Sequence, residues 1–131
     1  MTDQIENGEL RIENRENPLL KKSYDFALLI VKIVRKIQQD EREFILTKQV
    51  LRSGTAIGAM SEEAQQAESK ADFIHKLAIA NKEAHETHYW LRLIRDANLN
   101  SNAVDELIMQ CSELKRLLIS IIKSAKARKV K

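Results

Sequence analysis

The sequence predicts an all-α protein that folds as an antiparallel up-down-up-down four-helix bundle. Among 131 residues there is one proline and there are three glycines, while 44% of residues are hydrophobic and 31% are charged. This balance favours long helices over sheet. Hydrophobic residues recur at helical spacing in four segments, and the polar connections between them are short. Short connections make consecutive helices antiparallel neighbours, and the length is that of a single domain.

The first helix is predicted from Leu19 or Ser23 to about Gln39. It follows the step Asn17-Pro18, where the residue before proline avoids the helical region and proline suits a first helical turn. The inward positions expected for this helix are Leu20, Tyr24, Ala27, Val31 and Val34.

Three further helices are predicted at about 43–67, about 69–97 and, after a polar break at 98–102, up to about 125. Ser69 or Asp72 can cap the third of the four. The predicted organisation is a polar N-terminal arm (1–17), a four-helix bundle (18–125) and a basic C-terminal tail (126–131).

Two glycines lie one helical turn apart in the second predicted helix, within the run RSGTAIGAM. Gly54 and Gly58 should each destabilise a helix by roughly 1 kcal/mol relative to alanine. We expect them to let a neighbouring helix approach closely, with Ala78, Ala80 and Ala84 of the third helix as partners. A helix kink at the glycines stays open. A phosphate-binding loop is not favoured, because the run has neither glycine-rich nucleotide motif.

The first helix also carries a second hydrophobic strip beside the first one, and the fourth helix has hydrophobic residues outside its main seam. A helix that is apolar on two sides is expected to be buried on two sides, which predicts a subunit interface. An unusually broad core stripe is the alternative. The interface residues expected on this hypothesis are Phe26, Ile30, Ile33, Ile37, Leu117 and Ile119.

Residues 52–94 resemble the core signature of the 23S rRNA intervening-sequence protein family, also known as four helix bundle proteins. The similarity lies in the segments Arg52–Met60, Ser69–Lys76 and Lys82–Leu91, and the opening residues 17–34 are also similar. The sequence departs from the family pattern at Ala56, where serine is common, and at Met60, where asparagine is common.

The resemblance implies an antiparallel four-helix bundle that assembles into a ring-like homopentamer. Family members are encoded in insertions within bacterial large-subunit rRNA genes and elsewhere, and most have no established biochemical activity. The related accessory variability determinant of diversity-generating retroelements shares the pentameric bundle and binds nucleic acid and a reverse transcriptase. The resemblance therefore implies an oligomer and suggests a nucleic-acid partner.

No catalytic constellation, cofactor site or metal site is predicted from the sequence. A di-iron bundle needs repeated Glu-x-x-His motifs, whereas Asp72-x-x-His75 occurs once and His85-x-x-His88 offers two ligands only. The polar run from Lys82 to Trp90 is interpreted as packing and ion pairs, with Lys82 and Glu86 as an i,i+4 pair.

The single cysteine, Cys111, is interpreted as a small buried hydrophobe. The N-terminal residues do not have the pattern of a signal peptide, and no hydrophobic run is long enough to span a bilayer. A cytoplasmic location without a membrane partner is the expectation.

The C-terminal part of the chain is strongly basic. The net charge is +3 and the pI is about 9.0. A solvated tail and a nucleic-acid contact are both consistent with this pattern. The residues expected to bind nucleic acid are Lys115, Arg116, Lys123, Lys126, Arg128, Lys129 and Lys131.

The favoured function is therefore a non-enzymatic homo-oligomeric scaffold or adaptor that contacts RNA or DNA, or a protein partner, through basic surfaces. The alternative is a nucleic-acid-binding accessory factor of a retroelement reverse transcriptase. A metal-dependent enzyme ranks third.

Overall fold

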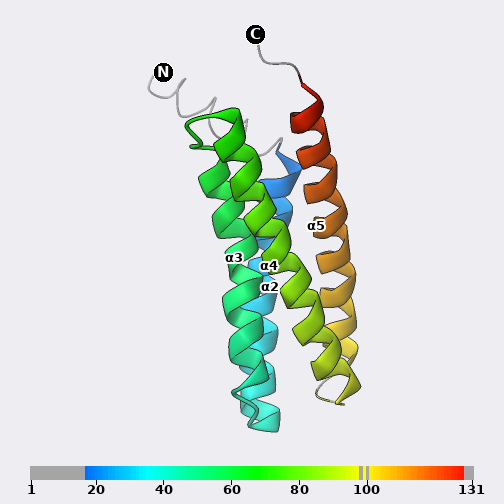
Figure 1. Cartoon of the computed structure of the whole chain (residues 1–131). Helices are drawn as coiled ribbons and strands as arrows, with labels where there is room; N and C mark the ends of the chain where they lie inside the picture. The colour runs from blue at the N-terminus through cyan, green and yellow to red at the C-terminus, as the bar shows by residue number, and fades with distance from the viewer. Residues whose placement is uncertain (1–16, 98, 100, 129–131) are drawn as a thin grey trace, which may run out of the picture.

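The computed structural model describes residues 17–97, 99 and 101–128 and folds them into four helices. The helices are α2 (Pro18–Glu41), α3 (Leu46–Ala64), α4 (Lys70–Asp96) and α5 (Ser101–Ala127), shown in Figure 1. No strand occurs in the described part of the chain. The prediction of an all-helical protein with four helices is confirmed, and the predicted arm lies almost entirely outside the described residues.

Neighbouring helices close a ring, because α2 packs on α3, α3 on α4, α4 on α5, and α5 on α2. Gln38 Nε2 donates a hydrogen bond to Thr47 Oγ1 at 3.1 Å near the α2–α3 connection. Further along, Gly54 lies against Ile30 and Gly58 against Ser23. Residue numbers thus fall on one helix as they rise on the other, so α2 and α3 run in opposite directions. Figure 1 shows the same reversal at each later connection, with α2 beginning and α5 ending at one end of the bundle.

Side-chain caps fix where α2 and α4 begin. Asn17 Oδ1 accepts hydrogen bonds from the backbone N–H groups of Leu19 (3.1 Å) and Leu20 (3.2 Å). Ser69 Oγ accepts one from the N–H of Asp72 (3.0 Å). These contacts satisfy N–H groups that have no partner within their own helix. Of the two caps considered for α4, Ser69 is therefore the one used.

The start of α3 is capped by a glutamate. The Glu43 carboxylate accepts hydrogen bonds from the N–H groups of Ile45 (3.0 Å), Leu46 (2.9 Å) and Thr47 (2.9 Å). Burial of the carboxylate raises its pKa, but these hydrogen bonds outweigh that effect and hold the pKa below its usual value. The preceding residue, Arg42, has a left-handed backbone (φ 55°) that ends α2.

Replacing Glu43 with alanine is expected to lower the free energy of unfolding by about 1 kcal/mol at neutral pH, as for other lost helix caps. The pKa is depressed in the folded state, so the stabilisation is complete above the pKa of the unfolded chain and disappears as pH falls through the folded value. Chemical denaturation of the parent protein and the Glu43→Ala variant should be measured at about pH 7 and about pH 3. The difference in their free energies of unfolding should be smaller at the lower pH. A difference that is the same at both pH values would contradict this account of the cap.

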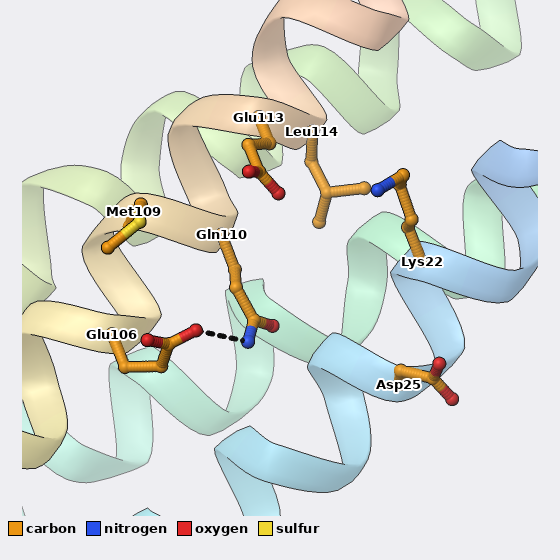
Figure 2. A pocket seen from close by; sticks show the side chains of 7 residues that line it. All are labelled: Lys22, Asp25, Glu106, Met109, Gln110, Glu113 and Leu114. Atoms are coloured by element: carbon orange, nitrogen blue, oxygen red, sulfur yellow. Dashed lines mark hydrogen bonds between the residues drawn. The ribbon is translucent and has the colours of Figure 1, made fainter.

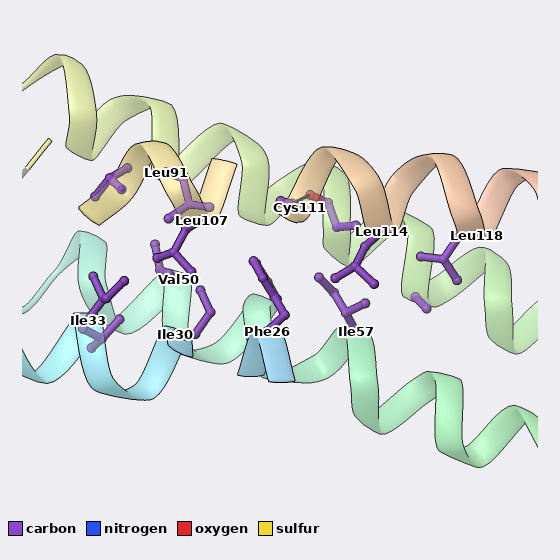
Figure 3. Close-up of a cluster of buried hydrophobic side chains, with 14 of the residues drawn as sticks. Phe26, Ile30, Ile33, Val50, Ile57, Leu91, Leu107, Cys111, Leu114 and Leu118 are labelled. Carbon is purple, nitrogen blue, oxygen red and sulfur yellow. Dashed lines mark hydrogen bonds between the residues drawn. The ribbon is translucent and has the colours of Figure 1, made fainter. Parts of the chain in front are cut away.

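The core is a single hydrophobic cluster contributed by all four helices. Figure 3 shows Phe26 and Ile30 of α2 pointing toward side chains of α3 and α5. Phe26 and Ile30 are fully buried, as are Ile57, Leu91 and Leu107. Burying large side chains of this kind provides the main driving force for folding.

This core corrects the predicted subunit interface. Phe26, Ile30, Ile33 and Ile37 are buried within their own chain and are not available to another subunit. The other strip of the same helix, which was predicted to face the core, includes Tyr24, and this side chain is 58% exposed. Leu117 is half-buried against the core, and of the six residues only Ile119 is exposed.

The glycine pair packs against a different helix from the one predicted. A Cβ atom at Gly54 would lie 3.1 Å from the Ile30 side chain, and one at Gly58 would lie 3.3 Å from the backbone oxygen of Ser23. The nearest atoms at both positions belong to α2 and not to the alanines of α4, so the glycines allow α2 to approach α3 closely. Each contact draws the Ser23–Ile30 side of α2 inward, which explains why that strip forms the core. α3 continues through both glycines.

None of the described helices combines the length and the hydrophobicity that a membrane-spanning segment requires.

Candidate nucleic-acid interface

Five cations lie on the C-terminal half of α5 or, in the case of Arg128, directly after its end, and we call them the α5 basic stripe: Lys115, Arg116, Lys123, Lys126 and Arg128. Residues 114–131 contain no aspartate or glutamate. Lys115 is half-buried and the other four are exposed. No member of the stripe forms an ion pair within the part of the chain that the structure describes. Lys129 and Lys131, predicted to belong to the same surface, lie outside the described residues.

The carboxylates of α4, which packs beside α5, are all engaged with other partners. Asp72 pairs with Lys76 on the same helix (3.4 Å), and Asp96 pairs with Arg95 (2.8 Å). The remaining two, Glu83 and Glu86, pair with the α3 side chain of Arg52. The carboxylates of α4 are thus paired within α4 or with Arg52 of α3, and none of these ion pairs involves the α5 basic stripe.

The α3–α4 contact includes an ion-pair network. Arg52 Nη1 lies 3.4 Å from Glu83 Oε1, and Arg52 Nη2 contacts Glu86 Oε2. Trp90 Nε1 donates a hydrogen bond to the same Glu86 oxygen at 3.0 Å. This hydrogen bond, helped by the charge of Arg52, lowers the pKa of Glu86 against the opposing effect of burial. The predicted Lys82–Glu86 pair does not form; the closer guanidinium of Arg52 takes that carboxylate.

Toward α5, α4 presents a positive cluster in place of carboxylates: the histidine cluster, formed by His85, His88 and Arg92 of α4 with Lys115 of α5. Burial and then the charge of Lys115 lower the pKa of His85. The same two causes lower the pKa of His88, with further contributions from Arg92, His85 and Arg95. The two imidazoles therefore lie in a positive field that continues into the α5 basic stripe.

Comparison with known proteins identifies the chain. Residues 15–120 match the family model described as 23S rRNA-intervening sequence protein. The chain belongs to this family. A crystal structure from Bacteroides thetaiotaomicron, described as a protein with unknown function from the S23 ribosomal protein family, is similar at 47% sequence identity with a TM-score of 0.76. The match covers 80% of this chain and 98% of that one. Comparison with curated proteins gives no match.

The chain also has a pocket between α2 and α5, and its lining includes no member of the α5 basic stripe. Figure 2 shows the Lys22 side chain of α2 reaching toward Leu114 of α5, whereas the Asp25 carboxylate points away from the α5 side chains. Its volume is about 250 Å³, and its other lining residues are Glu106, Met109, Gln110, Glu113 and Leu114. Gln110 donates a hydrogen bond to Glu106 at 2.8 Å. Lys22 is opposed by three carboxylates, so this pocket is a poor site for a polyanion.

Within the described residues of this family member, no three His, Cys, Asp or Glu side chains gather in a way that could hold a metal ion. His85 and His88 lie one turn apart, but their neighbours are cations, which disfavour a bound metal. Cys111 is buried and donates a hydrogen bond to the carbonyl oxygen of Ala84 at 3.2 Å. Burial raises the pKa of its thiol to about 12, against a smaller opposing effect of Lys115. A thiol with that pKa is not a nucleophile at neutral pH.

Sequence reasoning found the α5 basic stripe in this family member but not the α4 side of the interface. The sequence analysis weighs His85 and His88 as metal ligands and favours packing and ion pairs for the run that contains them, and it does not single out Arg92. The available signal was their i,i+3 and i,i+4 spacing, which places them in a row on one helix. That row becomes part of a basic face only because α4 packs beside Lys115.

Proposed function

We propose that the chain is a non-enzymatic, homo-oligomeric scaffold that contacts RNA or DNA through the α5 basic stripe. The observation that carries this proposal is a group of five cations, four of them exposed, along the end of α5, none of which forms an ion pair among the described residues, beside a helix whose carboxylates pair elsewhere. Such a face attracts phosphate backbones without reading sequence, because Lys and Arg replace the counterions of the nucleic acid. The absence of aromatic residues from the stripe favours backbone contacts over base stacking.

Binding to a short RNA duplex is expected to weaken as the salt concentration rises. For each phosphate contacted, the logarithm of the association constant should fall by about 0.9 for every tenfold rise in salt concentration. Replacing Arg116, Lys123 and Lys126 with alanine should reduce both the affinity and the slope of that salt dependence. Fluorescence anisotropy over a salt series measures both quantities.

The matched control removes three exposed cations elsewhere, with Lys32, Arg35 and Lys48 replaced by alanine. A general effect of net charge would weaken binding equally in the two triple variants and would count against the stripe. An absence of binding by the parent protein at low salt would overturn the nucleic-acid proposal. A third variant, with alanine at Lys129 and Lys131, tests the two predicted residues outside the described part of the chain.

The homo-oligomer is proposed on the family resemblance and on the hydrophobic side chains that α2 and α4 leave exposed. Tyr24 and Leu28 of α2 are 58% and 46% exposed, and Tyr89 and Leu93 of α4 are 49% and 38% exposed. Exposed apolar side chains grouped on one helix are typical of protein–protein interfaces. These four residues replace the buried strip as candidate subunit contacts.

Light scattering is expected to give a mass near five times 15.1 kDa. Replacing Leu28 with aspartate should shift the mass toward that of a single chain while the helical circular-dichroism signal is retained. A parent protein that is monomeric at all concentrations would refute the assembly.

An accessory role for a reverse transcriptase rests on the resemblance alone and stays a prediction.

A further inference from the structure

The α5 basic stripe lies at the end of the bundle where the chain enters α2. Figure 1 shows α2 beginning and α5 ending at that end, and Figure 2 shows the Lys22 side chain reaching toward Leu114 of α5. The two helices run in opposite directions and rise by the same distance per residue. Going back from Lys22 to Asn17 therefore moves the neighbouring position on α5 forward from Leu114, into the stripe. The residues before Asn17 thus join the bundle beside the stripe.

Those residues, 1–16, lie outside the part of the chain that the structure describes, and their charge is opposite to that of the stripe. They contain five acids and two bases, which gives a net side-chain charge of −3. We call them the acidic N-terminal segment. The stripe has five cations, and none of them forms an ion pair among the described residues. The acids of the segment are Asp3, Glu6, Glu9, Glu13 and Glu16.

The acidic N-terminal segment is long enough to cover the stripe. The helical part of the stripe, from Lys115 to Lys126, rises about 17 Å along α5, and a helix is about 10 Å wide. Arg116 and Lys123 are seven residues apart and therefore lie on the same face of α5. Both side chains are exposed. Sixteen extended residues span up to about 55 Å, so the segment can cross α5 and follow that face without any movement of the bundle.

We propose that the acidic N-terminal segment docks on the α5 basic stripe and competes with nucleic acid for it. The competition rests on the proposed function, whereas the docking needs no nucleic acid. Carboxylates and phosphates bind lysine and arginine through the same charge-assisted hydrogen bonds. Exposed ion pairs are weak, but a segment attached at Asn17 meets the stripe at a millimolar effective concentration. An effective concentration of about 4 mM against a dissociation constant of about 1 mM weakens RNA binding about fivefold.

The first experiment measures the affinity of the full chain for a short RNA duplex at low salt. A variant in which Glu6, Glu9 and Glu13 are replaced by glutamine should bind about fivefold more tightly than the parent protein, because its segment competes less. The matched control replaces three exposed glutamates of the bundle by glutamine and changes the net charge by the same amount. This control should bind like the parent protein. Its substitutions are at Glu62, Glu63 and Glu68.

The second experiment detects the docking by NMR without nucleic acid. A nitroxide label is attached at Asn7→Cys, and the native Cys111 stays unlabelled because it is buried and its thiol has a pKa of about 12. The label should broaden the backbone signals of Arg116 and Lys123, but not those of Asp40 at the far end of α2. The broadening should weaken in about 1 M salt, which screens exposed charges. It should also weaken in the triple glutamine variant of the segment.

The two experiments separate failure of the docking from failure of the proposed function. Broadening that is the same with and without the three glutamates would mean that the segment is near the stripe only because it is attached there, and would overturn the docking. Equal gains in RNA affinity for the two triple variants would overturn the competition, because net charge alone would explain them. Charge-dependent broadening in a chain that binds no RNA at low salt would support the docking and refute the proposed function.

Discussion

Replacing Phe26 with alanine is expected to lower the free energy of unfolding by about 4 kcal/mol, the usual loss when a fully buried phenylalanine is truncated. Phe26 is fully buried, and Figure 3 shows its ring pointing toward the side chains of α5. The truncation removes buried apolar surface and leaves a cavity, because packed neighbours relax only in part. Urea denaturation followed by circular dichroism measures the loss.

Lys32→Ala is the matched control for this prediction, since Lys32 is exposed on the same helix. Its effect on the free energy of unfolding should stay within about 0.5 kcal/mol. If Phe26 were a subunit contact, as its hydrophobic strip first indicated, Phe26→Ala would lower the mass in solution and leave the chain stably folded. That outcome would contradict the core described above.

The existence of the four helices could be predicted because the signals for it are local. The Asn17-Pro18 step places a cap and a first-turn proline side by side, and α2 begins there. Ser69, one of two caps considered for α4, accepts the hydrogen bond of the first turn. Glu43 was placed only at the edge of a helix, because a glutamate cap is not among the residue types usually preferred at that position.

The rotation of α2 about its axis could not be predicted from the helix alone. Both of its strips are hydrophobic, so periodicity ranks them equally. Contacts with α3 determine which strip is buried. Gly58 lets the Ser23 backbone approach, and Gly54 leaves room for the Ile30 side chain. The two residues of each pair are about thirty residues apart in the sequence. A contact over that separation forms only in the tertiary structure, so the pattern of one helix does not reveal it.

The same reasoning applies to the candidate interface. The cations of the α5 basic stripe all lie between residues 115 and 128, a stretch without a single acid, so the sequence alone indicates a basic surface there. The histidine cluster unites α4 with Lys115 from a different helix, and the network of Arg52 removes Glu83 and Glu86 from that face. The grouping of the histidines with Lys115 and the pairing of the glutamates with Arg52 both depend on which sides of the helices pack together, and the sequence of one helix does not show this. Sequence reasoning therefore predicted the α5 part of the candidate interface and interpreted the run that contains the histidines as packing and ion pairs.

Replacing Gly58 with leucine is expected to lower the free energy of unfolding by about 3 kcal/mol through overpacking. A Cβ at this position already lies 3.3 Å from the backbone oxygen of Ser23, and a backbone atom cannot rotate away as a side chain can. The remaining atoms of leucine would have to push α2 away from α3. Ala59→Leu places the same side chain at the next, exposed position of α3 and should change stability by no more than about 0.5 kcal/mol. Thermal and urea unfolding of the two variants test this, and equal stabilities would mean that α2 and α3 do not approach closely at Gly58.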